Sequence, residues 1–545
     1  MLKIAICQLN FIVGDIDGNS QKILAHIKKA KKQNCDLVVF SELAICGYPP
    51  YDLLFEEYFV NKCIDAINNI AKESVGITAI VGGIDLNKGN GKSLFNTAFV
   101  LSDGKIAAKY YKALLPTYDV FDEARYFEPF YKPVIVNIKD KKVAVTICED
   151  LWTAEIDKNP VPGKPYYRYD VIKENKILNP DLLVNIAASP YSYFQIEYRY
   201  EILKKAQKLL GCPIVYVNQI GCQTDIVFDG GSAYIDSNGI QIASFFGENL
   251  YFVNNNSINS FNLPQIGKIE SIYHALILGI KDYMYKNNFK KVIIGLSGGI
   301  DSAVVTVLAA DALGSENVHA FLMPSRYSSL HSVEDSLELC KINNISYDIV
   351  SIEPVFEKIT EILFPLFNNK KWDTTEENIQ ARIRAIYLMA FSNKNGYVLL
   401  NTSNKSEMAV GYGTLYGDMC GAISVLGDVY KTQVYELAYF LNKEKKRIPE
   451  NIILKAPSAE LRPNQKDSDS LPEYSLLDKI LFHIIEEQKY VSDIIQLGYN
   501  ETVVKEVFRL VQSMDYKRFQ APPVIRISPK AFGMGRRFPL VKKWI

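Results

Sequence analysis

Residues 291–303 read KVIIGLSGGIDSA, and the architecture expected for the second half of the chain follows from them. A buried strand over 292–296 precedes two glycines and a helix that starts near Asp301 and Ser302. Glycines let backbone N–H groups approach an anion, and a helix start offers unpaired N–H donors. The stretch therefore predicts a phosphate-binding turn. Because a carboxylate beside phosphates is tolerable mainly when Mg²⁺ bridges them, Asp301 is interpreted as a metal ligand.

The glycine turn differs from two common nucleotide-binding motifs. A Walker A loop needs a lysine after its second glycine, and the dinucleotide fingerprint has no acid where Asp301 stands. A plain strand-to-helix turn is the alternative explanation for two glycines alone. The whole string Ser-Gly-Gly-x-Asp-Ser resembles the pyrophosphate loop of the ATP pyrophosphatase superfamily. The resemblance implies an enzyme that adenylates a carbonyl oxygen and releases pyrophosphate.

Strand and helix patterns alternate on both sides of this turn. Residues 271–289 have helical spacing, and strands and helices then alternate through 401, which predicts a doubly wound parallel sheet of the α/β class. The polar, aperiodic segment at 254–260 marks a domain boundary. We therefore predict a first domain over 1–253, a linker over 254–270 and a second domain over 271–545.

Length and composition exclude several classes of protein. A chain of 545 residues exceeds one ordinary core, so two domains of about 250 residues are expected. Lys plus Arg and Asp plus Glu each number 61, and this zero net charge argues against a nucleic-acid partner. The nine cysteines are scattered without a CxxC pair, which argues against disulfides and zinc ribbons. Without a signal-peptide pattern or a membrane-length apolar run, the sequence predicts a cytoplasmic protein with no membrane contact.

The first half mixes hairpins with strand–helix alternation. Hairpins are expected at 95–111, around Asp103-Gly104, and at 233–245, around Asn238-Gly239. Buried strands are also expected at 4–9, 36–40, 143–147, 182–186 and 214–217. Such a mixture favours a layered α/β sandwich over a purely parallel sheet.

Three chemically suggestive residues lie at strand ends in this half. Cys148 ends a buried strand in VAVTICEDLW (143–152). Lys112 ends a hairpin strand in YYKALLPTYDVFDE (110–123), and Glu42 follows a strand in DLVVFSELAICGYPP (36–50). A single cysteine is more often an inert core residue. The acids after Cys148 cannot lower its pKa, so a nucleophilic thiol here needs a cation from elsewhere.

These three segments resemble the nitrilase superfamily, whose fold is an αββα sandwich. The resemblance implies that Cys148 attacks the side-chain amide of L-glutamine, Glu42 acts as general base and Lys112 stabilises the oxyanion. It also implies glutamine-binding roles for Tyr118, for Ser189 in NIAASPY (185–191) and for Gln195 in YSYFQIE (191–197). The family usually has a basic residue at the position of Gln195, and Arg199 is the nearest substitute. The extra residues near 159–169 have no assigned role.

Further motifs in the second half resemble the glutamine-dependent NAD synthetases. They are ENIQARIR (377–384), LNTSNKSEMAVGYGTLYGD (400–418), GDVYK (427–431), AELRPNQKD (459–467) and YKR (516–518). The resemblance implies that ATP is bound by Gly295, Leu296, Ser297, Gly298, Gly299, Ile300, Asp301, Ser302 and Thr402. It implies that Asn378, Glu407 and Lys517 bind deamido-NAD, and that Asp301 and Glu407 lie at Mg²⁺. Loops at 325–336 and 459–474 would order over the substrates, with Lys431 and Lys517 offsetting phosphate charge.

Together the two resemblances imply one enzyme. Ammonia released from glutamine in the first domain would travel through an enclosed tunnel and amidate adenylated deamido-NAD in the second. NAD⁺, AMP, pyrophosphate and glutamate would be the products, and the chain would form a homo-oligomer. Two alternatives stay open. One is another amidotransferase with the same pyrophosphate loop, such as a GMP or asparagine synthetase. The other is a nitrilase-type amidase with a regulatory nucleotide module.

Overall fold

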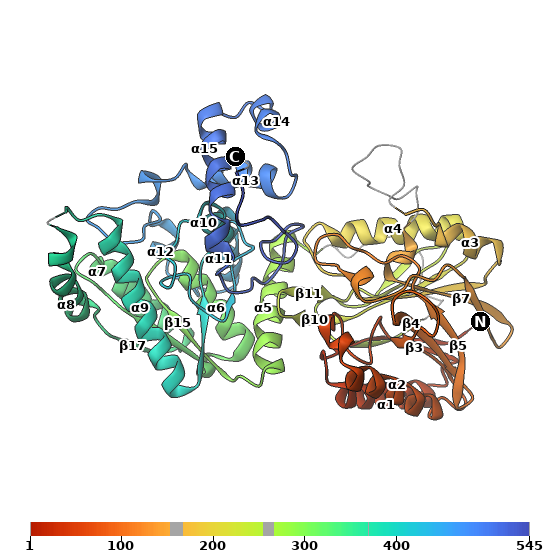
Figure 1. Ribbon diagram of the computed structural model, residues 1–545. Helices are drawn as coiled ribbons and strands as arrows, with labels where there is room; N and C mark the ends of the chain where they lie inside the picture. Colours follow the sequence, from red (N-terminus) through yellow and green to blue (C-terminus); the bar gives the residue numbers. More distant parts are fainter. Residues whose placement is uncertain (1, 153–166, 254–265, 369, 544–545) are drawn as a thin grey trace. The chain divides into compact units, whose positions relative to one another are not determined.

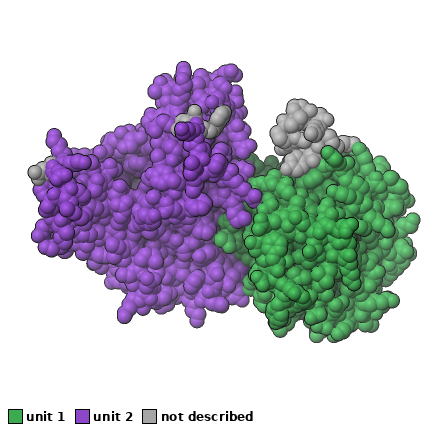
Figure 2. Space-filling view, in the orientation of Figure 1, with its two compact units in different colours: residues 1–266 green, residues 267–545 purple. Residues whose placement is uncertain are grey.

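A computed structural model describes residues 2–152, 167–253, 266–368 and 370–543. The chain forms two compact units, residues 1–266 and 267–545, which are coloured separately in Figure 2. Most of the predicted linker, and residues 159–166 of the segment without an assigned role, lie outside the described residues. None of the helices in the described ranges is long and apolar enough to cross a membrane.

Two six-stranded sheets form the framework of the first unit (Figure 1). The first sheet has the order β14 (Asn249–Phe252), β1 (Ile4–Gln8), β2 (Leu37–Val39), β3 (Thr78–Leu86), β4 (Leu94–Ser102), β5 (Lys105–Tyr111). The second sheet has the order β13 (Ile240–Ile242), β12 (Ala233–Ile235), β9 (Ile214–Asn218), β8 (Leu182–Ala187), β7 (Lys141–Ile147), β6 (Val134–Ile138). A separate hairpin joins β10 (Ile220–Gln223) and β11 (Ile226–Asp229). Both predicted hairpins, β4–β5 and β12–β13, are present.

The alternation of side chains along the strands builds two apolar layers. On β1, Ile4 and Ile6 belong to a core shared with strands of the second sheet, such as Val145 on β7. Ala5 and Cys7 face the other way, into a core with α1 (Ile16–Lys32) and α2 (Glu57–Lys72). Figure 1 shows these helices on one side of the paired sheets, with α3 (Val171–Ile177) and α4 (Gln195–Leu210) on the other. The predicted αββα sandwich is confirmed.

A five-stranded, all-parallel sheet forms the centre of the second unit. Its order is β17 (Ser346–Ile349), β16 (Val318–Leu322), β15 (Lys291–Gly295), β18 (Tyr397–Asn401), β19 (Ile423–Ser424). The chain starts in the middle at β15, runs outward to β17 and returns to β18 on the other side. The direction of winding therefore reverses between β15 and β18, and ligands of such sheets bind at the carboxyl ends of these strands. The predicted doubly wound sheet is confirmed.

Helices complete the second unit (Figure 1). The sheet is flanked by α5 (Lys268–Lys286), α6 (Ile300–Leu313), α7 (Leu330–Asn343), α8 (Glu353–Leu363), α9 (Thr374–Asn395), α11 (Lys431–Leu441) and α12 (Glu450–Leu454). A second apolar core joins α10 (Lys405–Val410), α13 (Tyr474–Ile485), α14 (Val491–Gln496) and α15 (Glu501–Ser513), which precede α16 (Asp515–Arg518). Short 3₁₀ turns are η1 (Tyr51–Phe55), η2 (Glu123–Arg125), η3 (Cys148–Leu151), η5 (Ser315–Asn317), η6 (Phe364–Phe367) and η7 (Asp467–Asp469).

Two candidate active sites

Cys148 lies where β7 turns into η3. Its φ is +44°, a left-handed conformation that a residue with a side chain adopts only when its surroundings enforce it. Burial raises the pKa of the Cys148 thiol well above its usual value, the charge of Glu42 adds to this, and Lys112 opposes it. Lys112 is therefore the cation that acts on this thiol.

Lys112 is fully buried between two carboxylates. Its Nζ lies 2.7 Å from Oε1 of Glu42 and 2.8 Å from Oε1 of Glu123. Burial alone would lower the pKa of Lys112, but the two carboxylates outweigh it and raise the pKa. Glu42 also accepts hydrogen bonds from Nδ2 of Asn96 (2.7 Å) and the backbone N–H of Ala188 (2.9 Å). The structure thus brings together the three side chains predicted from separate strand ends.

Glu123 is a site residue that sequence reasoning missed. It is buried at the start of η2 and accepts a hydrogen bond from Tyr48 Oη (2.9 Å) as well as from Lys112. Burial raises the pKa of Glu123 to about 7. The charge of Lys112 lowers this pKa, and the charge of Glu42 raises it. The only local signal was an acid eleven residues after Lys112, and acids at that distance are common in loops.

Tyr118, a predicted glutamine-binding residue, contacts a second acid to which the sequence analysis gave no role. Tyr118 and Tyr167 both donate hydrogen bonds to Oε1 of Glu149, at 2.8 and 2.9 Å. Burial raises the pKa of Glu149 to about 7, although both tyrosines lower it. The backbone N–H of Ser189 donates to Oδ1 of Asn218 (2.8 Å), and Gln195 is the half-buried first residue of α4.

Arg199 is committed to another partner. Its guanidinium is buried on α4 and forms a two-point ion pair with Asp229, at 3.1 and 2.9 Å. It also donates to the carbonyl of Gly230 (3.3 Å). The charge of Arg199 is therefore neutralised by Asp229, which argues against its replacing a basic residue at position 195.

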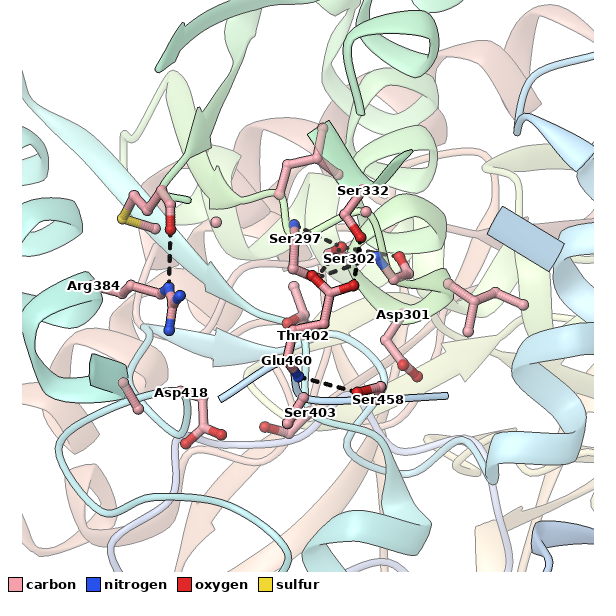
Figure 3. A pocket seen from close by; sticks show the side chains of 18 of the residues that line it. Ser297, Asp301, Ser302, Ser332, Arg384, Thr402, Ser403, Asp418, Ser458 and Glu460 are labelled. Carbon is pink, nitrogen blue, oxygen red and sulfur yellow. Dashed lines mark hydrogen bonds between the residues drawn. The ribbon is translucent and has the colours of Figure 1, made fainter. Parts of the chain in front are cut away.

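The second site is a cavity of about 290 Å³ at the carboxyl ends of β15 and β18 (Figure 3). Its lining includes these predicted residues: Gly295, Leu296, Ser297, Gly298, Gly299, Ile300, Asp301, Ser302, Thr402 and Glu407. Asn378 and Lys517 do not line it. Oδ1 of Asn378 accepts from Thr414 Oγ1 (2.8 Å), and Nζ of Lys517 donates to the carbonyls of Gly411 (2.8 Å) and Gly413 (2.7 Å). Both side chains therefore contact the 411–414 segment, whose Tyr412 lines the cavity.

Gly298 shows why the turn needs glycine. Its φ is +78°, and a Cβ at this position would lie 2.4 Å from the carbonyl oxygen of Ser332, at the start of α7. The turn is closed by the Ser302 hydroxyl, which accepts from the Ser297 N–H (3.3 Å) and donates to the Gly299 carbonyl (3.0 Å). Backbone therefore packs on backbone at the mouth of the predicted phosphate site.

Two carboxylates meet a lysine in this cavity. Nζ of Lys431 lies 2.5 Å from Oδ2 of Asp301 and 3.6 Å from Oε1 of Glu407. Oδ1 of Asp301 accepts from Nδ2 of Asn404 (2.9 Å). Burial and the charge of Asp301 raise the pKa of Glu407 to about 8. A further cation at Asp301 and Glu407 would therefore reduce the repulsion between the two carboxylates.

Oxygen-only ligands of this kind fit Mg²⁺, which commonly takes one or two carboxylates together with substrate phosphates. In the part of the chain that the structure describes, no group of three or more metal-binding side chains occurs. Asp301 and Glu407 together provide two carboxylates, so Mg²⁺ at this position would need further ligands, such as substrate phosphates.

The two loops expected to cover the substrates contact one another. The carboxylate of Glu460 accepts hydrogen bonds from the hydroxyls of Ser329 (3.0 Å) and Ser332 (2.8 Å) and from Nζ of Lys455 (2.5 Å). Arg384, which sequence reasoning did not select, also lines the cavity. Burial lowers its pKa to about 10, and it donates to the carbonyl of Met323 (3.1 Å). Arg384 is half-buried, and no described residue pairs a carboxylate with it, which suits an anionic ligand.

Comparisons with known proteins match both units and the whole chain. The family model of carbon-nitrogen hydrolases matches residues 3–157, and that of NAD synthase matches residues 272–521. A glutamine-dependent NAD(+) synthetase from Synechocystis sp. is 40% identical over 99% of both chains. The chain belongs to the glutamine-dependent NAD(+) synthetase family.

Other members of this synthetase family support the same assignment. The enzyme from Thermotoga maritima is 38% identical over 100% of this chain and 99% of its own. A solved structure of the Acinetobacter baumannii synthetase in complex with adenosine diphosphate is 37% identical, with a TM-score of 0.78 over 100% of this chain and 99% of that one. The synthetase from Cytophaga hutchinsonii, at 20% identity, shares the fold with a TM-score of 0.84 over 99% and 98% of the two chains. The match to the family is therefore continuous across both units.

Proposed function

We propose that the protein forms NAD⁺ from deamido-NAD, ATP and L-glutamine. The first unit hydrolyses glutamine, and the second adenylates deamido-NAD and amidates it with the ammonia released. The observation that carries the proposal is a Glu42–Lys112–Cys148 set, in which Glu42 and Lys112 are buried and Cys148 is partly exposed, in a chain whose second unit holds a glycine-rich turn and paired carboxylates around one cavity. Two alternative hypotheses were another amidotransferase and an amidase with a regulatory module. Neither accounts for a sequence that is 40% identical to a glutamine-dependent NAD(+) synthetase over 99% of both chains.

In the first unit, Glu42 takes the proton of the Cys148 thiol as the sulfur attacks the side-chain amide carbon of glutamine. The ammonium group of Lys112 stabilises the negative oxygen of the tetrahedral intermediate. Glu42 then returns the proton to the leaving nitrogen, which departs as ammonia. A water molecule, deprotonated by Glu42, cleaves the thioester to glutamate and regenerates the thiol.

In the second unit, the backbone N–H groups of residues 295–302 bind the phosphates of ATP. The carboxylate of deamido-NAD attacks the α-phosphorus, and pyrophosphate leaves. Ammonia attacks the resulting acyl adenylate, loses a proton and displaces AMP. Lys431 and Arg384 offset the negative charge, and Asn378, Glu407 and Lys517 bind deamido-NAD.

Asp301 and Glu407 would hold Mg²⁺. When bound, the ion neutralises charge on the departing pyrophosphate. We further propose that the enzyme works in the cytoplasm as a homo-oligomer, and that ammonia passes between the units in an enclosed tunnel. Full exchange of the transferred nitrogen with added ¹⁵N-ammonium during glutamine-driven turnover would refute the tunnel.

The test of the function compares wild type with Cys148→Ala. NAD⁺ formation from deamido-NAD, ATP and Mg²⁺ is measured with glutamine and, separately, with ammonium. The variant is expected to lose the glutamine-driven reaction and to keep the ammonium-driven one. Cleavage of ATP to AMP without NAD⁺ formation would mean that the acceptor is not deamido-NAD. Glutamine-driven NAD⁺ formation by the variant would mean that Cys148 is not the nucleophile.

A further inference from the structure

Asp150 is a fully buried carboxylate two residues after Cys148. Its Oδ1 accepts hydrogen bonds from the backbone N–H groups of Ala113 (3.2 Å) and Leu114 (2.9 Å). Its Oδ2 accepts from the backbone N–H of Ile147 (2.9 Å) and from Tyr110 Oη (2.8 Å). This carboxylate takes no part in the proposed proton transfers, although it accepts hydrogen bonds from four donors.

The backbone donors flank the two catalytic side chains. Ala113 and Leu114 directly follow Lys112, and Ile147 directly precedes Cys148. Lys112 follows β5 of the first sheet, whereas Cys148 follows β7 of the second. A single carboxylate therefore joins the ends of two strands that belong to different sheets and that carry the cation and the thiol.

These bonds require an ionised carboxylate, which presents only acceptor positions, about four in number. An asparagine would direct two N–H donors of its own toward groups that are themselves donors. Burial raises the pKa of Asp150 to about 6, while the N–H groups of Ile147 and Leu114 lower it. At pH 8 the group is therefore ionised and able to accept all four hydrogen bonds.

We propose that Asp150 is a positioning residue for glutamine hydrolysis, which holds the backbone of Lys112 and that of Cys148 at a constant separation. The inference rests on the proposed roles of those two residues. Asp150 acts through Lys112. The charge of Lys112 must lie close to the sulfur to favour the thiolate, and close to the amide oxygen to stabilise the oxyanion. A misplacement of about 1 Å in such a pair costs roughly 100-fold in rate.

The test uses the full-length enzyme with Asp150→Asn, and Tyr110→Phe as matched control. Tyr110→Phe removes one of the four donors and leaves the carboxylate in place. For Asp150→Asn we expect kcat for glutamine-driven NAD⁺ formation to fall about 100-fold, with KM for glutamine changed much less. Ammonium-driven NAD⁺ formation should stay at the wild-type rate. Tyr110→Phe should retain most of its glutamine-driven activity.

A second readout separates positioning from simple loss of folded protein. The rate at which iodoacetamide alkylates Cys148 is followed against pH by mass spectrometry of its peptide, because the chain has eight other cysteines. In Asp150→Asn the inflection of this profile should move to higher pH, since Lys112 no longer lies at its wild-type position. An unmoved profile, or wild-type kcat, would overturn the proposal. If Cys148→Ala still uses glutamine, the proposed function itself fails, whatever Asp150→Asn shows.

Discussion

Removal of the positive charge of Lys112 should destabilise the first unit in a pH-dependent way. In Lys112→Met the ammonium group disappears from between Glu42 and Glu123, which lie 2.7 and 2.8 Å from it and are buried. Loss of one partner from a buried ion pair costs about 3–5 kcal/mol, because the remaining charge has no compensation. We therefore expect a loss of this size at pH 8.

The pH dependence follows from Glu123. Its pKa in the folded protein is raised to about 7, so the stability it contributes is present at low pH and is lost as the pH rises through 7. Without Lys112 that pKa rises further, and the carboxyl stays protonated at pH 8. A difference of one proton between the two proteins changes their relative stability by about 1.4 kcal/mol per pH unit. The stability that Lys112→Met loses relative to wild type should therefore be smaller at pH 6 than at pH 8 by roughly this amount.

Lys109→Met, on β5 three residues before Lys112, is the matched control. Lys109 pairs with Asp85 at a similar distance, 2.7 Å, but its side chain is 36% exposed, and exposed pairs contribute about 0.2–1 kcal/mol. Hydrogen exchange read on peptides of β5 and β7, with peptides of β15 and β18 as internal reference, reports each unit separately. If the two variants lose the same stability at pH 8, the reasoning about buried charge is wrong.

Three further outcomes are expected. Gly298→Ala should abolish AMP formation with either nitrogen donor, because its Cβ would lie against the Ser332 carbonyl. Gly396→Ala, with a φ of +69° and no atom within 4 Å of the added Cβ, should keep its activity and lose only about 1–2 kcal/mol of stability. Equal losses of AMP formation in the two variants would contradict this. The pKa of Glu149 is about 7, so wild type should lose about 2 kcal/mol of stability in the first unit as the pH rises from 5.5 to 8. Glu149→Gln should not show this loss. If the free energy of unfolding of the two proteins changes equally with pH, the expectation is wrong. Chelation of divalent cations should stop AMP formation with glutamine or ammonium, and thiol alkylation of Cys148 should continue at its previous rate. AMP formation that survives exhaustive chelation would exclude Asp301 and Glu407 as metal ligands.

Much of the fold could be predicted because its signals are local. The turn residues between β4 and β5 and between β12 and β13 lie beside the strands they connect, and both hairpins formed as expected. The glycine turn before α6 is likewise formed by a few adjacent residues, so its pattern is visible in the sequence. The candidate catalytic residues Glu42, Lys112 and Cys148 were recognisable from the resemblance of their segments to the nitrilase superfamily, and each lies at or shortly after the end of a strand.

The partners of those residues were not recognisable from local patterns. Lys431 reaches Asp301 across 130 positions of sequence, and Glu42 and Glu123 share one lysine only because two strand ends converge. Arg199, a candidate for a glutamine contact, is neutralised instead by Asp229 from β11. Each of these pairings depends on the order and stacking of the strands, which a linear pattern does not encode.

The order of residues along the chain was enough to determine the two fold classes, the glycine turn and the strand-end positions of Glu42, Lys112 and Cys148. Only the tertiary structure decided which charges lie together and which are buried, and with them the raised pKa values of Glu123, Glu149 and Glu407. The physical reason is that hydrogen-bonded turns and strand periodicity arise between near neighbours. Desolvation and Coulomb energy instead depend on distances through space, which exist only once the sheets have packed.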